Sequence, residues 1–337
     1  MAAVAQAVSV YGAMDPAPWH TGLSPEGARF ALAHATAPYA GRSLAWPAGL
    51  RPPRRTVIWC AGNVFTAPLE WTATLAAAGG QIVLKAPSAV PEPALALARC
   101  FAAQGLPVQA HALPHDQAWH LLDDADAVLG FGSDSAMLAL DARLGPSVRR
   151  ALFGHRVSAA VVAGVRDVEG LVGDAVLYDG RGCKSPVAVF ALAEAEAVAE
   201  RLAAGLAEAS VAVPRGRMEA AWGPRWRRRV GLARILDHAH AGDEWAVPVL
   251  PARWFEPEPL PRLVPVHPVA DLGEVRQALA GLPLGSCATN LDPSAARALH
   301  QVLGFPVVTP PGGLHATALD GHHEDTDIRA VLGEELP

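Results

Sequence analysis

The sequence has 337 residues, of which 51% are hydrophobic and 18% are charged, and its formal net charge is −6. A chain of this length exceeds the usual size of a single hydrophobic core, so we expect two lobes. The acidic balance excludes nucleic acid as the main partner, and no apolar run approaches the ~20 residues that cross a bilayer.

The first 55 residues are rich in Pro, Ala and Gly and lack the basic and apolar regions of a secretory signal, so we expect a cytoplasmic protein. The apolar run Thr56–Cys60 then predicts a buried strand. A helix is predicted to begin at Pro68 and to end at Gly79, because proline is favoured at the first helical position and glycine beyond the last.

The same alternation of strand and helix continues to residue 152. It predicts strands over 81–85, 108–113 and 127–132, and helices over 91–105 and 115–122. Such alternation is typical of a parallel sheet covered by helices on both faces. We therefore predict a Rossmann-type nucleotide-binding domain over residues 1–152, with the tail 315–337 as a candidate to pack back on it.

A second α/β domain, the catalytic lobe, is predicted over residues 153–314. Its predicted strands are 157–162, 187–192, 245–250 and 263–266, followed by a strand and helix pair over 285–303. A long helix is expected over 194–209, and Asp271 is expected to cap a helix that ends near Gly281.

Four cysteines are widely spaced along the chain, at positions 60, 100, 183 and 287. They show neither the CxxC spacing of a zinc site nor a small disulfide framework. Cys183 is the best candidate nucleophile, because it follows Gly180 and Gly182 where few side chains obstruct attack. The cationic neighbours Arg181 and Lys184 favour the thiolate. Inert filling of the interior is the alternative interpretation of this lone thiol.

The segment around Cys183 is one of several that resemble the aldehyde dehydrogenase superfamily, and more closely its LuxC-type acyl-CoA reductases. The resemblance covers most of the chain and is carried, in order, by 62–64, 84–88, 130–134, 154–158, 178–186, 245–247, 258–266 and 320–323. It implies an α/β, aldehyde-dehydrogenase-like fold with a nucleotide lobe and a catalytic lobe. It also implies that Cys183 forms an acyl thioester before hydride transfer.

The resemblance assigns further roles around the nucleophile and the adenosine. Asn63 corresponds to the asparagine that, with the backbone N–H of the cysteine, stabilises an oxyanion; a turn residue at the end of a strand is the alternative. Lys85 corresponds to the lysine that binds the adenosine ribose, and otherwise it is a solvated lysine. Ser88 stands where NAD-preferring relatives often carry glutamate, which favours NADPH and leaves NADH open.

Two more positions are implied to bind the cofactor. Gly132 and Ser133 lie between a strand and a helix, where backbone amides meet a pyrophosphate, although such loops also occur as plain turns. Glu258 corresponds to the glutamate that holds the nicotinamide ribose, and an exposed loop carboxylate is the alternative.

The segment 152–158 lacks the glutamate that serves as the base in hydrolytic aldehyde dehydrogenases. This absence favours the reductive direction, in which an acyl-CoA loads Cys183 and the thioester is reduced to an aldehyde. His155 is a candidate proton carrier in this scheme, or it only hydrogen-bonds its neighbours or the cofactor.

Two polar clusters carry no assigned catalytic role. His315, His322 and His323 near the C-terminus are interpreted as packing or substrate-edge residues, and we predict no metal site. The basic run 225–229 is interpreted as a solvated helix face, with the phosphates of CoA as the alternative partner.

The sequence therefore predicts an NADPH-linked acyl-CoA reductase. The alternatives are a hydrolytic aldehyde dehydrogenase, a reductase of acyl phosphates or carrier-bound thioesters, and a non-catalytic protein that retains the fold. The expected partner is an acyl-CoA or a related acyl thioester, and both a homo-oligomer and a partner enzyme that exchanges acyl or aldehyde groups are left open.

Overall fold

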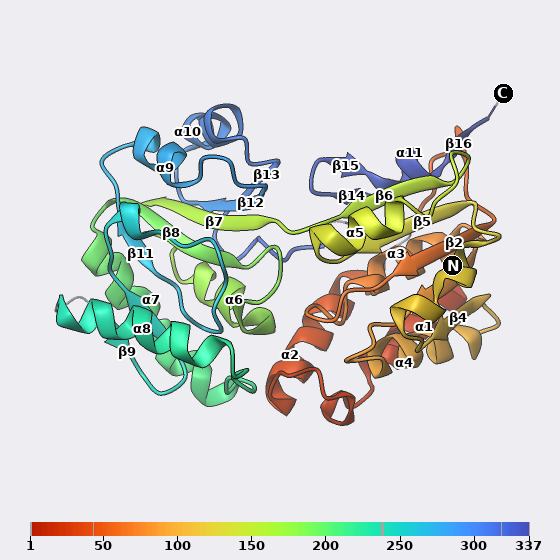
Figure 1. The fold of residues 1–337 in the computed structure, drawn as a ribbon, viewed down its shortest axis with the longest axis horizontal. Coiled ribbons are helices and arrows are strands. Elements are labelled where there is room, and N and C mark those ends of the chain that lie inside the picture. The colour runs from red at the N-terminus through yellow and green to blue at the C-terminus, as the bar shows by residue number, and fades with distance from the viewer. Residues whose placement is uncertain (1, 43, 237–238, 318, 337) are drawn as a thin grey trace. The chain divides into compact units, whose positions relative to one another are not determined.

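The computed structural model describes residues 2–42, 44–236, 239–317 and 319–336. The chain forms two compact units, which Figure 1 shows as a ribbon coloured along the chain. Unit 1 comprises residues 1–21, 31–155 and 317–337, and unit 2 comprises residues 22–30 and 156–316. The predicted boundary at residue 152 thus lies close to the point where the chain passes from one unit to the other. The functions assigned to the two units remain predictions.

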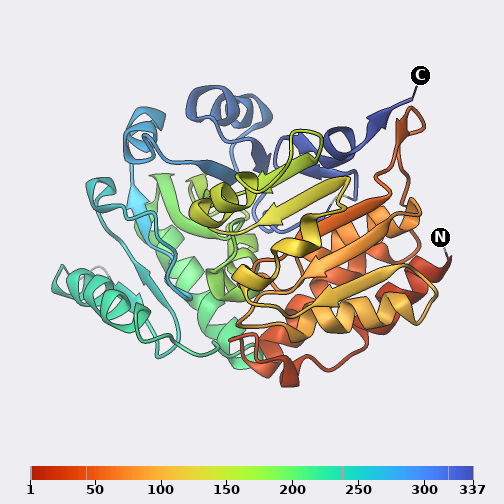
Figure 2. The ribbon, with the colours of Figure 1, turned by 45° about the vertical axis from the view of Figure 1, so that its right-hand side comes forward.

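Unit 1 is built on a five-stranded parallel sheet with the strand order β4-β3-β2-β5-β6. Its strands are β2 (Arg55–Trp59), β3 (Gln81–Lys85), β4 (Val108–His111), β5 (Ala127–Phe131) and β6 (Arg149–Phe153). The orange and yellow arrows of β2 to β5 run in the same direction in Figure 2. The chain moves outward from β2 in one direction through β3 and β4, and in the other through β5 and β6. The carboxyl ends of β2 and β5 therefore form a topological switch point, where ligands bind in open α/β sheets.

Helices and short turns cover both faces of this sheet. One face carries α3 (Pro68–Ala77) and α4 (Glu92–Ala102), against which α1 (Ala2–Gly12) packs. The other face is covered by η4 (Trp119–Leu122) and α5 (Asp134–Asp141). Its core consists mainly of Val57, Trp59, Val83, Leu121, Leu122, Val128, Met137 and Leu140. Successive side chains of a strand point to opposite faces of the sheet. Because helices and turns cover both faces, the strand sequences are nearly continuous apolar runs.

Unit 2 repeats the same strand order with different segments. Its parallel sheet has the order β11-β8-β7-β12-β13, with strands β7 (Val157–Ala163), β8 (Pro186–Ala193), β11 (Val266–Pro268), β12 (Leu284–Thr289) and β13 (Val307–Thr309). The first strand again lies in the centre, and the switch point falls between β7 and β12.

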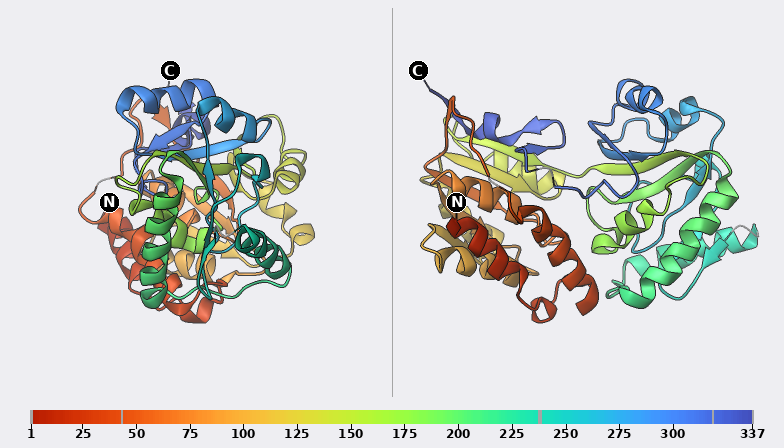
Figure 3. Two further views of the ribbon diagram at one scale, coloured as in Figure 1. Left: turned by 90° about the vertical axis from the view of Figure 1, so that its left-hand side faces the viewer. Right: turned by 180° about the vertical axis from the view of Figure 1, so that it is seen from behind.

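The helices of unit 2 also lie on both faces of its sheet. On one face α6 (Gly170–Val176) and α7 (Ala195–Ala212) bury Leu171, Val198, Leu202 and Leu206 against the sheet; α7 is the long green helix of Figure 3. The other face packs on α9 (Leu272–Ala278) and on the π-helical turn η7 (Leu299–Leu303), which the short helix α10 (Pro293–Ala298) precedes. Outside these layers, α8 (Trp222–Ile235) packs on the hairpin formed by β9 (Ala239–Ala241) and β10 (Ala246–Pro248).

Smaller elements complete the described chain. They are β1 (Leu50–Arg51) paired with β16 (Glu334–Glu335), β14 (His322–His323) paired with β15 (Thr326–Asp327), α2 (Pro25–Thr36), α11 (Ile328–Leu332), and the short helical turns η1 (Ala17–Trp19), η2 (Ala37–Tyr39), η3 (His115–Gln117), η5 (Leu177–Gly180) and η6 (Ala252–Trp254). Within the described ranges, no helix combines the length and the apolar character that a membrane span requires.

Several elements differ from the sequence predictions. The single helix predicted over 115–122 is wrong, because this stretch forms two separate 3₁₀ turns, η3 and η4. The strand predicted over 263–266 begins only at Val266, and Leu263 takes part in isolated bridges instead. The cap predicted at Asp271 is confirmed, since its carboxylate accepts hydrogen bonds from the backbone N–H groups of Gly273 and Glu274.

Candidate active site

Cys183 lies on the short connection between η5 and β8 in unit 2. It is partly exposed, whereas Cys60, Cys100 and Cys287 are buried. Burial raises the pKa of Cys60 to about 12 and also raises the pKa values of Cys100 and Cys287. Since the thiolate is the reactive form, these three buried cysteines are poor nucleophiles. Cys183 is therefore the cysteine whose position suits chemistry.

The backbone that leads into Cys183 has an unusual conformation. Tyr178 and Asp179 have φ values of 55° and 54°, which place both residues in the left-handed region. Such conformations cost on the order of 1 kcal/mol or more each for residues with a side chain, so the surrounding structure must hold them.

A buried ion pair holds this backbone in place. Arg262 donates from Nε to Oδ1 of Asp179 at 2.8 Å, and its backbone N–H donates to the carbonyl oxygen of Asp179 at 3.2 Å. The side chains of Arg262 and Asp179 are 0% and 4% exposed. The second carboxylate oxygen of Asp179 accepts a hydrogen bond from the backbone N–H of Gly216 at 2.9 Å. Asp179 thus joins three segments that are far apart in the sequence.

Ser158 fixes the backbone immediately after the Cys183 side chain. Its hydroxyl donates to the carbonyl oxygen of Cys183 at 2.6 Å and accepts from the backbone N–H of Ser286 at 2.9 Å. A Cβ atom at Gly285 would lie 2.8 Å from this hydroxyl, so glycine leaves the space that the contact needs. Ser158 is fully buried in β7 and links the Cys183 peptide to the centre of the sheet.

Sequence reasoning missed a polar cluster beside the Cys183 segment. His315 Nε2 lies 3.2 Å from Ser185 Oγ and 3.2 Å from the carbonyl oxygen of Asp174. Because a carbonyl only accepts, Nε2 carries the proton of this ring. The buried carboxylate of Asp174 in turn accepts from the backbone N–H groups of Gly312 and Leu314. Burial raises the pKa of Asp174 to about 6, although these amides act in the opposite direction.

The only sequence signal for this cluster is a carboxylate placed in the apolar helix α6. The carboxylates of Asp174 and Asp179 are both buried and hydrogen-bonded, so neither is placed as an accessible base.

In unit 1, Lys85 lies at the carboxyl end of β3, one strand from the switch point. It is 1% exposed, and its Nζ lies 5.3 Å from the centre of the Trp59 ring. Burial lowers the pKa of Lys85. Among the described residues, its ammonium group has neither an ion-pair partner nor a hydrogen-bond acceptor. A buried cation of this kind fits a ligand that brings hydroxyl or phosphate oxygens.

The other predicted cofactor residues of unit 1 lie at the same edge of the sheet. Ser88 is exposed after β3, with its Oγ 3.5 Å from the carbonyl oxygen of Leu113. The N–H of Gly132 donates to the carbonyl oxygen of Phe153 at 3.1 Å, so this amide is already used within the unit. The hydroxyl of Ser133 caps α5 by accepting from the N–H of Ala136.

The remaining predicted residues are divided between the units. Asn63 is exposed on the loop after β2 in unit 1. The backbone N–H of His155, also in unit 1, donates to Oδ1 of Asp134 at 2.8 Å. Glu258 belongs to unit 2, where it is exposed and forms an ion pair with Arg225 of α8.

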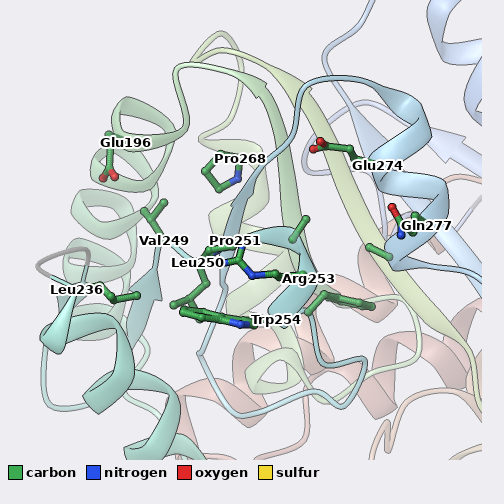
Figure 4. A pocket seen from close by; sticks show the side chains of 13 residues that line it. Glu196, Leu236, Val249, Leu250, Pro251, Arg253, Trp254, Pro268, Glu274 and Gln277 are labelled. Carbon is green, nitrogen blue, oxygen red and sulfur yellow. The ribbon is translucent and has the colours of Figure 1, made fainter.

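A separate groove of about 880 Å³ lies in unit 2 (Figure 4). It is lined by Arg253 and Trp254 of η6, by Glu196 of α7, and by Glu274 and Gln277 of α9. The groove includes Pro268 at the carboxyl end of β11, whereas Cys183 precedes the amino end of the neighbouring strand β8. The groove is therefore distinct from the segment that carries Cys183.

The histidine-rich tail packs within unit 1. The ring of His323 lies 5.3 Å from that of Phe131 and 4.4 Å from that of Phe153, in edge-on contacts that give it a packing role. Within the part of the chain that the structure describes, no group of three His, Cys, Asp or Glu side chains is arranged to hold a metal ion.

The two parallel α/β sheets and the thiol-bearing connection define a protein of the aldehyde dehydrogenase fold. The chain is similar to an NAD-dependent benzaldehyde dehydrogenase from Corynebacterium glutamicum, with 17% identity, a TM-score of 0.69, and coverage of 92% of this chain and 80% of that one. An aldehyde dehydrogenase from Brucella melitensis biovar abortus 2308 gives 17% identity and a TM-score of 0.71, covering 94% and 77% of the two chains. An NADP-dependent enzyme from E. coli gives 18% identity and a TM-score of 0.68, covering 93% of this chain and 78% of that one.

These likenesses establish the fold. The model of the LuxC acyl-CoA reductase family matches residues 49–326, so this chain belongs to that family of oxidoreductases. No curated protein sequence matches the chain. Both the fold class and the family resemblance predicted from the sequence are thereby confirmed.

Proposed function

We propose that this chain reduces the thioester of an acyl-CoA to an aldehyde, with Cys183 as the nucleophile and NADPH as the reductant. The observation that carries the proposal is the position of Cys183. Of the four cysteines it alone is not buried, and it lies on a backbone held by Asp179, Arg262 and Ser158. Membership of the acyl-CoA reductase family supplies the substrate class.

The reaction begins when the thiolate of Cys183 attacks the thioester carbonyl. A tetrahedral oxyanion forms, and its collapse breaks the bond to CoA and leaves an acyl group on the Sγ atom. The backbone N–H of Cys183 is one donor to this oxyanion, and Asn63 is the second donor that the resemblance implies; each donor of this type is worth about 3 kcal/mol. The hydrogen bond from Ser158 to the carbonyl oxygen of Cys183 holds the adjacent peptide in one orientation.

A nicotinamide cofactor, when bound, supplies a hydride to the carbonyl carbon of the acyl group. Lys85 and Ser88 would hold its adenosine end, because the ammonium of Lys85 is buried without an acceptor and the neighbouring Ser88 brings no carboxylate to repel a 2′-phosphate. The loop at Gly132 and Ser133 would face the pyrophosphate, and Glu258 would hold the second ribose. The names of the similar benzaldehyde dehydrogenase and E. coli enzyme, which include NAD and NADP, support a nicotinamide cofactor.

Reduction leaves a tetrahedral thiohemiacetal anion on Cys183, which expels the thiolate and releases the aldehyde. The reaction consumes one proton, which goes to the thiolate of the departing CoA. His155 is the candidate carrier of this proton. Asp174 and Asp179, the two carboxylates described above beside the Cys183 loop, are buried and hydrogen-bonded, which supports the proposal of reduction over hydrolysis of the acyl group.

The test of this proposal is trapping of the acyl group. Incubation with an acyl-CoA in the absence of cofactor should add the mass of one acyl group to the protein, and peptide mapping should locate it at Cys183. Cys183→Ala should abolish the adduct and lower kcat by at least about 10³-fold. Cys100→Ala is the matched control and should keep both. An adduct at another cysteine, or activity that survives in Cys183→Ala, would exclude the covalent role of Cys183.

A further inference from the structure

The segment 214–236, which contains α8, is the most strongly basic part of this acidic protein. It contains seven arginines and one glutamate, whereas the whole chain has a formal charge of −6. Most of α8 lies in the teal part of the ribbon in Figure 1. Two tryptophans, Trp222 and Trp226, alternate with the arginines along it.

Several of these arginines are used by the fold. Arg229 is buried and binds Glu256 through Nε and Nη2, and Arg228 binds the same carboxylate. Arg225 is paired with Glu258. Arg215 is held through backbone and side-chain contacts to Glu244. These contacts fix α8 on unit 2 and account for its attachment.

Three exposed arginines are left over by this pairing: Arg217 and Arg227, which lie nearer the two tryptophans in the sequence, and Arg234 in the last turn of α8. Within the described ranges, Arg217 and Arg227 have no carboxylate partner, and both side chains are exposed. Buried donors nearby are also unsatisfied by the protein, namely Nε of Arg215 and Nε1 of Trp226. The guanidinium of Arg215 lies 5.6 Å from the ring of Trp226. The surface thus offers planar cations beside aromatic rings, a combination suited to phosphates and a purine base.

This basic surface is joined directly to the Cys183 loop. The guanidinium of Arg181, two residues before Cys183, lies 5.7 Å from the ring of Trp222. The backbone N–H of Gly216 binds Asp179 of the same loop, and that of Arg217 donates to the carbonyl oxygen of Gly22. The basic segment therefore contacts the Cys183 loop directly, through Trp222 and Gly216.

The length of a CoA molecule matches this arrangement. About thirteen bonds separate its thioester sulfur from the first phosphorus atom, which gives a reach of about 15 Å if three bonds of an extended chain span ~3.5 Å. Cys183 is separated from the ring of Trp222 by two residues of chain, by the side chain of Arg181, and by the 5.7 Å from its guanidinium to the ring. This separation is of the same order as the reach of CoA. A thioester placed at Cys183 can thus extend its phosphates to α8.

We propose that Arg217 and Arg227 bind the phosphate groups of the CoA nucleotide and so select CoA thioesters over thioesters that lack it. This inference rests on the proposed function, because it assumes that the thioester carbonyl reacts at Cys183. Arg217 and Arg227 act on binding of the substrate tail and take no part in the chemical step. Trp222 and Trp226 flank the phosphate site.

The test compares two thioesters of the same acyl group, one of CoA and one of pantetheine, which lacks the nucleotide. In the double variant Arg217→Ala, Arg227→Ala, KM for acyl-CoA should rise about tenfold or more, while kcat stays unchanged. KM for the acyl-pantetheine and for NADPH should not change. The matched control is Arg201→Ala, Arg276→Ala, which removes two exposed arginines of unit 2 at other surfaces and should leave every constant unchanged.

A binding measurement separates this inference from the proposed function. The dissociation constant of free CoA, measured by calorimetry, should rise by the same factor in the Arg217 and Arg227 variant whether or not the protein reduces the thioester. Three results would overturn the inference: unchanged CoA affinity, an equal rise in KM for both thioesters, or a rise in KM for NADPH instead. The inference would also be overturned if the wild-type protein had a higher kcat/KM for the thioester of an acidic carrier protein than for acyl-CoA.

Discussion

The two units share one strand order but have different residues at their switch points. In unit 2 the switch point between β7 and β12 carries Asn290, which directly follows β12 and is 7% exposed. Its Oδ1 accepts from the N–H of Ala163 at 2.8 Å, and its Nδ2 donates to the carbonyl oxygens of Gly164 and Arg166. These bonds use the amide of Asn290 within the unit at the place where such sheets bind ligands.

In unit 1 the corresponding edge carries small residues and a buried cation. Gly62 follows β2 and Gly132 follows β5, while Lys85 ends β3 without an acceptor for its ammonium group. Unit 2 instead places Cys183 before the amino end of β8. The same topology thus leaves one carboxyl edge available for a cofactor and closes the other, and this closed unit presents Cys183 from the opposite edge.

The largest effect is expected where the amino edge of unit 2 is held together. Asp179→Ala leaves the guanidinium of Arg262 buried without its counter-charge, so the free energy of unfolding should fall by about 3–5 kcal/mol. Urea denaturation measures this loss. The control is Arg201→Ala, which removes an exposed pair with Glu169 and should change stability by less than about 0.5 kcal/mol.

A double variant shows whether the charge or the packing matters at Asp179. Asp179→Leu combined with Arg262→Met removes both buried charges and should recover much of the lost stability. If Asp179→Ala were as stable as the Arg201 control, the ion pair would not hold the Cys183 loop.

A smaller effect is expected at the closed switch point. Asn290→Ala leaves the buried carbonyl of Gly164 and the partly buried N–H of Ala163 and carbonyl of Arg166 without their partner, which should lower the free energy of unfolding by about 1–2 kcal/mol. Cofactor affinity should not change, because this switch point holds no ligand in the proposed function. Asn63→Ala in unit 1 is the informative counterpart, since it should preserve stability and lower kcat. Weaker cofactor binding in Asn290→Ala would contradict the contrast between the two edges.

The sequence was sufficient for much of unit 1. β3 was predicted from its apolar run to the residue, and α3 was predicted from Pro68 and the two glycines that follow it. β6 was missed because two arginines open it and it lies at the sheet edge, so its burial is incomplete. α1 and α2 lie in the entry segment rich in Pro, Ala and Gly and were missed, although Val4, Ala7, Val8 and Tyr11 of α1 recur at helical spacing. Local patterns thus predict elements that are buried on both sides better than those at edges.

The candidate site divides in the same way. Cys183 was identified from its own neighbours, because glycines and cations flank it in the sequence. Asp179 and Ser158 were not identified, since their roles depend on Arg262, 83 residues away, and on Ser286, 128 residues away. Asn290 likewise acts on a strand 127 residues distant. One sequence without known contacts offers no signal for such pairs.

The smallest of these effects is expected at the open edge of unit 1. Lys85→Met removes a buried cation that has no acceptor in the protein, so stability should be unchanged or should increase slightly. KM for the cofactor should rise about tenfold, because the ribose or phosphate oxygens lose their charged donor.

The pH dependence gives Lys85 a second readout. Burial lowers its pKa in the folded state, so the unfolded chain binds more protons near that pKa and stability rises with pH through this range. Lys85→Met should remove this slope from a plot of unfolding free energy against pH, and a cofactor that pairs with the ammonium should raise the pKa and take up protons on binding. If Lys85→Met loses stability and keeps its cofactor affinity, Lys85 stabilises unit 1 and does not bind the cofactor. That result would contradict the role proposed for the carboxyl edge of this sheet.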